Sequence, residues 1–254
     1  MVWDECFSEI CKSLFRIKAQ CSSGTFKGTG FLVAKYKNPD KNSLVFATAK
    51  HLVKDLPNYE NIHWTIEKFD LIGNVIETLT FKTNIEKMGE SAIRIHDEYD
   101  IALLFTSDIS GGNNVPLRII DPRVGIRPGI KVGWAGFPAF AEKKTIRTNP
   151  CYFEGVISTT VDYEGKLFYM IDGHGGEGLS GGPLWYWNND LSNYEIIGIC
   201  SGYISQEDKL YYPGLVAFES INPLIYYLKS SNDLYINIIE VDEKDTKIEK
   251  IKRN

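Results

Sequence analysis

The sequence D-G-H-G-G-E-G-L-S-G-G-P-L, residues Asp172–Leu184, is the stretch from which the fold and the function are best inferred. Six glycines surround one serine, Ser180. A serine hydroxyl is a weak nucleophile unless a base lies beside it and a site exists for the developing oxyanion. Glycines can adopt backbone angles that turn several N–H groups toward one point. The N–H groups of Gly178 and Ser180 are therefore candidate oxyanion donors beside a nucleophilic hydroxyl.

Other interpretations of this stretch compete with a catalytic loop. The run 173–178 fits the dinucleotide pattern G-x-G-x-x-G, but that pattern needs a following helix, which G-G-P at 181–183 prevents. No G-K-[ST] follows, which excludes a P-loop. G-L-S-G-G also fits the nucleophile elbow of α/β-hydrolases, where the histidine comes after the serine. All four histidines precede Ser180: His51, His63, His96 and His174. A flexible surface loop is the remaining alternative.

Length and composition are those of a globular chain. With 254 residues, 43% of them hydrophobic, the chain can form one large domain or two small ones. The net charge of −5 disfavours nucleic acid or an anionic membrane as the main partner. No run approaches the roughly 18–20 apolar residues of a transmembrane helix. We therefore expect no nucleic-acid partner and no membrane partner.

The N-terminal sequence and the cysteines favour a cytoplasmic location. M-V-W-D-E-C-F-S-E-I-C carries acids and lacks the apolar core of a secretory signal. An odd number of cysteines without a C-x-x-C pair favours reduced structural thiols over a disulfide framework or a zinc site. The five are Cys6, Cys11, Cys21, Cys151 and Cys200. We expect neither metal nor other cofactor. The alternative to a cytoplasmic protein is the mature form of a secreted protein with an added methionine.

Short apolar runs separated by turn clusters predict an all-β barrel or sandwich. A first set of strands is predicted at 14–19, 30–34, 43–47, 63–69, 75–81, 93–95 and 101–105. After a crossing segment at 106–125, with a strand of its own at 115–120, a second set is predicted at 131–136, 152–160, 167–171, 182–187, 195–202 and 215–218. Apolar spacing predicts a short helix at 3–12, and Asn222-Pro223 predicts the start of a helix that continues through about Leu228.

Two residues are candidate partners of Ser180. His51 follows a buried strand and two small residues in L-V-F-A-T-A-K-H, a setting that gives a base a fixed backbone and room beside it. Asp100 stands directly before the apolar run I-A-L-L, where a buried carboxylate needs a partner such as an imidazole N–H. The alternatives are a surface histidine on a short helical turn and an aspartate that caps a turn.

These segments together resemble the motifs of the chymotrypsin-fold serine peptidases. T-A-K-H, D-I-A-L-L and G-x-S-G-G-P occur in the order found there. G-T-G-F at 28–31 and the eight-residue step from Asp172 to Ser180 are most similar to the HtrA-type branch. The resemblance covers roughly residues 14–228, and it implies peptidase activity through a catalytic triad.

The resemblance implies two antiparallel six-stranded β-barrels with the active site between them. Residues 1–120 would form the N-terminal helix and the first barrel, 121–230 the second barrel and a closing helix, and 231–254 a C-terminal strand and charged tail. Ser180 would attack the substrate, His51 would act as general base, and Asp100 would orient His51. The N–H groups of Gly178 and Ser180 would form the oxyanion hole.

The resemblance alone assigns the substrate-binding residues. Ser201, Gly202 and Tyr203 would edge the specificity pocket, Gly214 would keep its far wall open, and His174 would lie near its floor. A histidine at that floor could favour an acidic substrate residue when protonated, or a small apolar one when the ring turns away. Because no acid is expected there, a basic preference is not expected, and we predict a preference for small to medium uncharged residues.

The sequence departs from the family pattern in three ways. Leu179 replaces the acid that pairs with the new N-terminus in zymogen-activated members, and no I-V-G-G-like start exists. The disulfides of secreted members are missing, with Leu52 after His51. The stretch after residue 230 is too short for a PDZ domain. We expect neither zymogen activation nor PDZ-driven assembly.

These observations predict a cytoplasmic serine endopeptidase that acts on protein or peptide substrates. A non-catalytic binding module on the same fold and an esterase with the same triad are the alternatives. Since an ungated protease is harmful in a cytoplasm, we expect gating, either by ordering of residues 173–178 or by a regulatory partner that contacts the N-terminal helix or the C-terminal tail.

Overall fold

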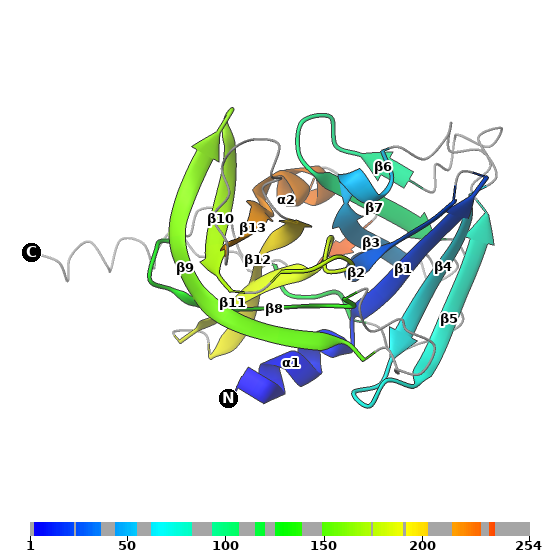
Figure 1. Cartoon of the computed structure of the whole chain (residues 1–254), viewed down its shortest axis with the longest axis horizontal. Coiled ribbons are helices and arrows are strands. Elements are labelled where there is room, and N and C mark those ends of the chain that lie inside the picture. The colour runs from blue at the N-terminus through cyan, green and yellow to red at the C-terminus, as the bar shows by residue number, and fades with distance from the viewer. Residues whose placement is uncertain are drawn as a thin grey trace, which may run out of the picture.

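The chain folds into two strand-rich units that lie side by side (Figure 1). The computed structural model describes residues 3–22, 24–36, 44–54, 62–82, 93–106, 115–119, 125–138, 149–173, 175–189, 192–202, 215–229 and 234–236.

The first unit is an antiparallel sheet with the strand order β5-β4-β1-β2-β3-β7-β6, and β14 is added to β2. Its strands are β1 (Leu14–Cys21), β2 (Gly24–Tyr36), β3 (Leu44–Ala49), β4 (His63–Phe69), β5 (Val75–Lys82), β6 (Ile93–Ile95), β7 (Ile101–Thr106) and β14 (Leu234–Ile236). β3 is buried along its whole length, because L-V-F-A-T-A offers no charged side chain to either face. It is the rigid element from which one side of the site is built.

The second unit is a closed antiparallel barrel with the strand order β10-β13-β12-β11-β8-β9. Its strands are β8 (Lys131–Gly136), β9 (Cys151–Tyr163), β10 (Lys166–Asp172), β11 (Pro183–Asn188), β12 (Asn193–Gly202) and β13 (Leu215–Ser220). Trp134 and Phe218 pack edge to face inside the barrel, with ring centroids 5.7 Å apart. The glycine-rich stretch leaves this rigid body at the end of β10 and returns to it at β11.

The predicted all-β class is confirmed, and both predicted helices are present. The first unit differs in detail, because its described strands form an eight-stranded sheet rather than a closed six-stranded barrel. The strand predicted at 115–120 is wrong for residues 115–119, where the structure has only an isolated parallel bridge between Ile119 and Ile196. Pro116 lacks the N–H group that a ladder requires, which explains why no strand extends through it.

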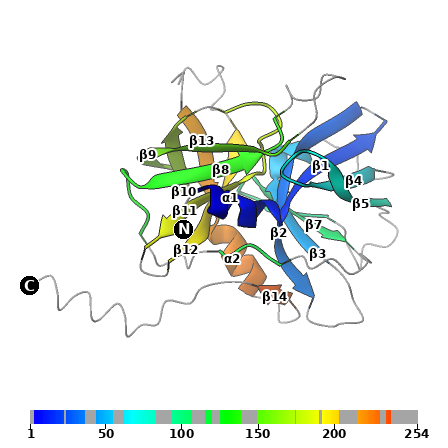
Figure 2. The same ribbon diagram turned by 90° about the horizontal axis from the view of Figure 1, so that it is seen from below.

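The helix α1 (Trp3–Cys11) leads into β1, which it contacts, and it also packs against the second unit. The Phe7 ring lies 5.3 Å from that of Tyr152 on β9, and the Lys131 ammonium of β8 lies 4.9 Å from the Trp3 ring. Figure 2 shows α1 directly beneath β8. The N-terminal segment therefore ties the two units together.

The helix α2 (Asn222–Lys229) follows β13 and buries Leu224, Ile225 and Leu228. Pro223 lies in its first turn, where a missing N–H group is tolerated. After α2 the chain returns to the first unit as β14, which pairs with β2. Both ends of the described chain thus cross between the units.

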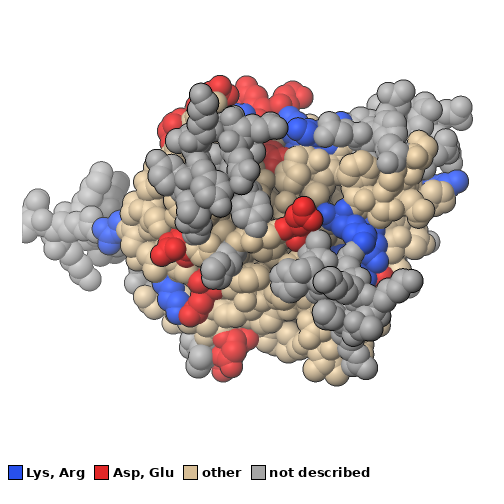
Figure 3. Space-filling model, in the orientation of Figure 1, with Lys and Arg blue, Asp and Glu red and all other residues tan. Residues whose placement is uncertain are grey.

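Charges of both signs are intermixed on the face shown in Figure 3, as far as the described residues cover it. The net charge of the chain is −5. Among the described residues, no helix has both the length and the apolar character needed to cross a membrane.

Candidate active site

The pairing of β3 with β7 places His51 beside Asp100. β3 ends at Ala49, whose register partner is Ile101, the first residue of β7. Asp100 immediately precedes that partner, and His51 lies two residues beyond Ala49 in the short 3-10 helix η1 (Lys50–Leu52). The Lys50 N–H group donates to the Asp100 carbonyl at 3.1 Å, which joins the two strand ends. The pairing of these two strands therefore brings both side chains to the same end of the strand pair.

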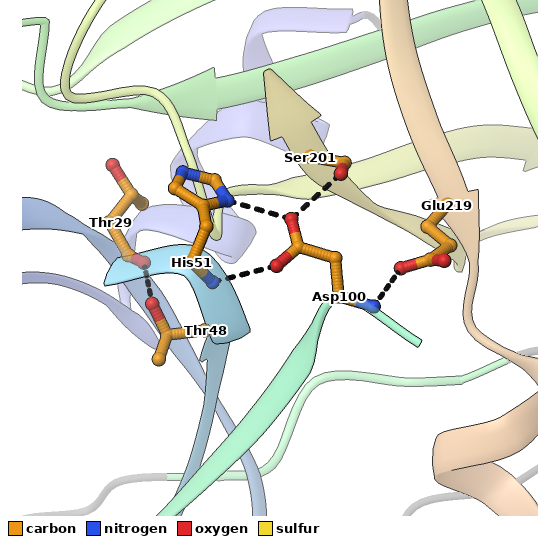
Figure 4. A network of polar contacts seen from close by, with 6 residues as sticks. All are labelled: Thr29, Thr48, His51, Asp100, Ser201 and Glu219. Carbon is orange, nitrogen blue, oxygen red and sulfur yellow. Dashed lines mark hydrogen bonds and ion pairs between the residues drawn. The ribbon is translucent and has the colours of Figure 1, made fainter. Parts of the chain in front are cut away.

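The Asp100 carboxylate accepts three hydrogen bonds (Figure 4). The backbone N–H group of His51 donates to Oδ1 at 2.7 Å, and the imidazole Nδ1 lies 2.7 Å from Oδ2. The Ser201 hydroxyl on β12 donates to the same Oδ2 at 2.7 Å. Three donors that converge on one carboxylate fix its orientation.

This contact also determines the tautomer of His51. An ionised carboxylate only accepts hydrogen bonds, so the proton of the contact belongs to Nδ1 and the neutral imidazole carries its lone pair on Nε2. Figure 4 shows the second ring nitrogen on the side away from Asp100. The imidazole is about one-third exposed, with 34% of its side-chain surface accessible. It can therefore accept a proton from a group that approaches from the open side.

Ser180 lies in the loop between β10 and β11 and is held by backbone contacts to both units. Its carbonyl accepts from the Thr29 N–H group at 2.9 Å, and the next N–H group, that of Gly181, donates to the Cys200 carbonyl at 2.7 Å. A Cβ atom placed on Gly202 would lie 3.7 Å from the Ser180 hydroxyl. Ser201, the neighbour of Gly202, holds Asp100. The structure therefore brings the Ser180, Asp100 and His51 segments to one place.

Close backbone packing explains two of the loop's glycines. Gly181 has φ +84°, and a Cβ atom there would lie 2.2 Å from the Thr29 carbonyl and 2.4 Å from the Thr48 hydroxyl. A Cβ atom on Gly182 would lie 2.2 Å from the Ala135 carbonyl. Real Cβ atoms do not approach oxygen atoms so closely, so larger residues would displace the backbone beside Ser180.

The two candidate oxyanion donors belong to a tight turn. The Leu179 N–H group donates to the Gly176 carbonyl at 3.2 Å, and the Gly182 N–H group donates to the Leu179 carbonyl at 2.9 Å. Gly178 has φ +88°. Neither the Gly178 N–H group nor the Ser180 N–H group donates a backbone hydrogen bond to another described residue. Such groups are suited to bind an anionic oxygen.

A hydroxyl from the first unit fixes this turn. Thr29 of β2 is fully buried; its Oγ1 donates to the Gly178 carbonyl at 2.7 Å and accepts from the Phe137 N–H group at 3.0 Å. The Thr48 hydroxyl donates to the Thr29 carbonyl at 2.7 Å (Figure 4). The motif G-T-G-F is visible in the sequence, but this function of its threonine is not.

Glu219 of β13 is a second residue of the site that the sequence motifs do not predict. Its carboxylate accepts from the Asp100 N–H group at 2.5 Å (Figure 4), and its side chain is almost fully buried. The feature of the sequence that could have indicated this residue is an acid inside the apolar run L-V-A-F-E-S. Ser201, predicted at the pocket edge, holds the Asp100 carboxylate here.

Three of the predicted substrate-binding residues, His174, Tyr203 and Gly214, lie outside the described residues. Among the described residues, no group of three His, Cys, Asp or Glu side chains is placed to hold a metal ion. The five cysteines are free thiols. Burial raises the pKa of the Cys200 thiol to about 12, so this neighbour of the site stays protonated near neutral pH.

Comparisons with known proteins identify the family and the fold of the chain. The family model of the trypsin-like peptidase domain matches residues 28–199, and the chain belongs to this family. Among solved structures, the chain is similar to Rv3671c from M. tuberculosis H37Rv, a serine-to-alanine mutant in an inactive form, with a TM-score of 0.56 and 16% sequence identity over 91% of this chain and 92% of that one. That likeness shows the fold. A search of curated proteins gave no match.

Proposed function

We propose that the protein is a serine endopeptidase in which Ser180, His51 and Asp100 form the catalytic triad. The observation that carries the proposal is the 2.7 Å contact between His51 Nδ1 and Asp100 Oδ2. It is supported by the hydrogen bond from Ser201 to Asp100 and by the short distance between the Ser180 hydroxyl and Gly202, the neighbour of Ser201. Membership of the trypsin-like peptidase family supports it.

The first half of the reaction forms an acyl-enzyme. Ser180 Oγ attacks the peptide carbonyl while His51 Nε2 takes the hydroxyl proton. The N–H groups of Gly178 and Ser180 stabilise the oxyanion of the tetrahedral intermediate. His51 then returns the proton to the leaving amine as the C–N bond breaks. Asp100 holds the imidazole in the required tautomer and stabilises its cationic form.

Water completes the turnover. It attacks the acyl carbonyl while His51 takes one of its protons, and collapse of the second intermediate releases the acid and returns that proton to Ser180. We propose residues 196–202 of β12 as the strand that pairs with the substrate backbone, with Ser201 and Gly202 at the edge of the specificity pocket. We propose His174, Tyr203 and Gly214 for the specificity pocket, with a preference for small to medium uncharged residues.

The proposal includes cytoplasmic location and control by a partner. Five free thiols support a reducing compartment. The helix α1 contacts β8 and β9 and offers a route from a bound partner to the second unit. If a chain shortened to residues 13–230 is as active as the full chain, and no partner changes its activity, this control is contradicted. Cell fractionation tests the location.

A fluorophosphonate probe tests the triad directly. We expect covalent labelling at Ser180, located by peptide mass, that is abolished in Ser180→Ala and strongly slowed in His51→Ala. Peptide cleavage should fall by about 10⁴–10⁶-fold in both variants. Turnover of small esters without cleavage of any peptide would favour the esterase. A folded protein that neither reacts with the probe nor cleaves peptides would overturn the proposal and favour a binding module.

A further inference from the structure

Glu219 is a carboxylic acid in an unusual place for a barrel strand. Only 1% of its surface is exposed, and its register partners on the neighbouring strands are the apolar Phe168 and Ile199. Burial of a carboxyl group is unfavourable unless a specific partner compensates for the lost hydration. The partner of this carboxyl group therefore indicates its function.

The partner is the backbone of Asp100. The Asp100 N–H group donates to Glu219 Oε2 at 2.5 Å, while the carbonyl of the same residue accepts from the Lys50 N–H group. Asp100 belongs to the first unit and Glu219 to the second, as Figure 4 shows by their ribbons. The contact therefore holds the loop that carries Asp100 against the barrel that carries Ser180.

The protonation state of Glu219 depends on its burial and on the charged groups around it. Burial, together with the nearby Asp100 carboxylate, raises its pKa to about 7. Within the described part of the chain, the other charged or titratable groups near it are Tyr99 beside Asp100, Lys50 on η1 and Lys166 on β10. The Lys50 ammonium already donates to the carbonyls of two residues, at 2.7 and 2.6 Å, namely His96 and Asp97.

We infer that Glu219 is a positioning residue for the Asp100–His51 pair, and that its ionisation changes how readily this pair takes up a proton. This inference rests on the proposed triad. Ionised Glu219 adds a second negative charge behind Asp100, which favours the imidazolium form of His51. Neutral Glu219 keeps the hydrogen bond to the Asp100 N–H group and removes that charge. The geometry is thus held in both states, and only the electrostatics differ.

Two substitutions separate position from charge. Glu219→Gln keeps an acceptor oxygen of similar reach and removes the titrating charge, whereas Glu219→Leu removes the acceptor. Glu195→Gln is the matched control, because Glu195 is equally buried in the same barrel but accepts from Tyr186 and Asn188, away from Asp100.

The readouts are the pH dependence of kcat/KM and the separate effects on kcat and KM. We expect Glu219→Leu to lower kcat by about tenfold or more with little change in KM. We expect Glu219→Gln to keep most of kcat and to shift the acidic limb of the profile to lower pH by about 0.3–1 unit. Glu195→Gln should leave the limb in place. Wild-type profiles for both Glu219 variants would overturn the inference.

A readout that needs no catalysis separates this inference from the proposed function. NMR titration of the four histidine rings, assigned with single His variants, reports proton uptake at His51 in wild-type and Glu219→Gln proteins. A shifted His51 titration in a protein that labels poorly supports the inference while the peptidase proposal fails. An unshifted titration in an active enzyme overturns the role of charge and leaves the peptidase proposal intact.

Discussion

The Thr29 hydroxyl donates a 2.7 Å hydrogen bond to the Gly178 carbonyl, across the boundary between the two units. That carbonyl belongs to the peptide between Gly178 and Leu179, in the turn whose flanking N–H groups are the proposed oxyanion donors. Rotation of this peptide would exchange its carbonyl and N–H directions and disturb the donor beside it. A buried hydroxyl from β2 therefore sets the geometry of a loop that begins about 150 residues later.

Thr29→Val tests this contact. Valine has a similar shape but lacks the hydroxyl, so the Gly178 carbonyl loses its donor and the Phe137 N–H group loses its acceptor. We expect kcat to fall by roughly 10–100-fold, as for a displaced oxyanion donor, and stability to fall by about 1–3 kcal/mol. Steady-state kinetics and denaturant unfolding measure the two effects.

Thr29→Ser is the matched control, since it keeps both hydrogen bonds. It should retain kcat within a few-fold. If Thr29→Val lowers the stability by the expected amount but leaves kcat unchanged, the hydroxyl stabilises the fold alone and does not position the turn.

Gly181→Ala should destabilise the protein strongly. Its φ of +84° disfavours an alanine, and the added Cβ atom would lie 2.2 Å from the Thr29 carbonyl. We expect a loss of at least about 3 kcal/mol in the free energy of unfolding, because backbone strain and a steric clash combine. Chemical denaturation measures it.

Gly129→Ala separates the two causes. Gly129 has φ +90° but open space around its Cβ position, so its substitution should cost only about 1 kcal/mol. Equal losses at the two glycines would show that the close contact beside Ser180 contributes nothing.

The sequence allowed the His51–Asp100 pair to be predicted because both residues stand at the ends of buried apolar runs. Runs such as L-V-F-A-T-A and I-A-L-L must pair within the core, and their pairing brings the flanking polar residues together. Each signal is local, so a single sequence was sufficient for the pair and for the all-β class.

The contributions of Thr29 and Glu219 could not be derived in the same way. Each contact joins two units, and its existence depends on how β2 and β13 are placed against loops from the opposite unit. The packing of α1 on the barrel has the same origin. Long-range placement follows from the packing of many side chains together, and no short pattern records it.

Ser201→Ala should weaken the triad without removing it. The Asp100 carboxylate would keep its two hydrogen bonds from His51 and lose the third, from the Ser201 hydroxyl. We expect kcat to fall by roughly 10–150-fold, in line with about 1.5–3 kcal/mol for a hydrogen bond to a charged group. Kinetics on a peptide substrate, with the Ser180 labelling rate as a second measure, checks this. A kcat equal to wild type would indicate that the two hydrogen bonds from His51 suffice to hold the Asp100 carboxylate.

Glu219 predicts a pH dependence of stability that can be isolated by subtraction. Its folded pKa, about 7, lies above the ordinary value of 4.5, so the folded protein holds this proton more tightly than the unfolded chain. The stabilising effect is full below about pH 4.5 and is lost as the pH rises through about 7, by up to about 3 kcal/mol.

Glu219→Gln does not titrate there, so the stability of wild type relative to this variant should decline across that window. Unfolding curves at half-unit pH steps measure the difference, with Glu195→Gln as the control. Parallel curves for wild type and Glu219→Gln would show that the Glu219 carboxyl group titrates normally, and the charge behind Asp100 would then be present throughout the working pH range.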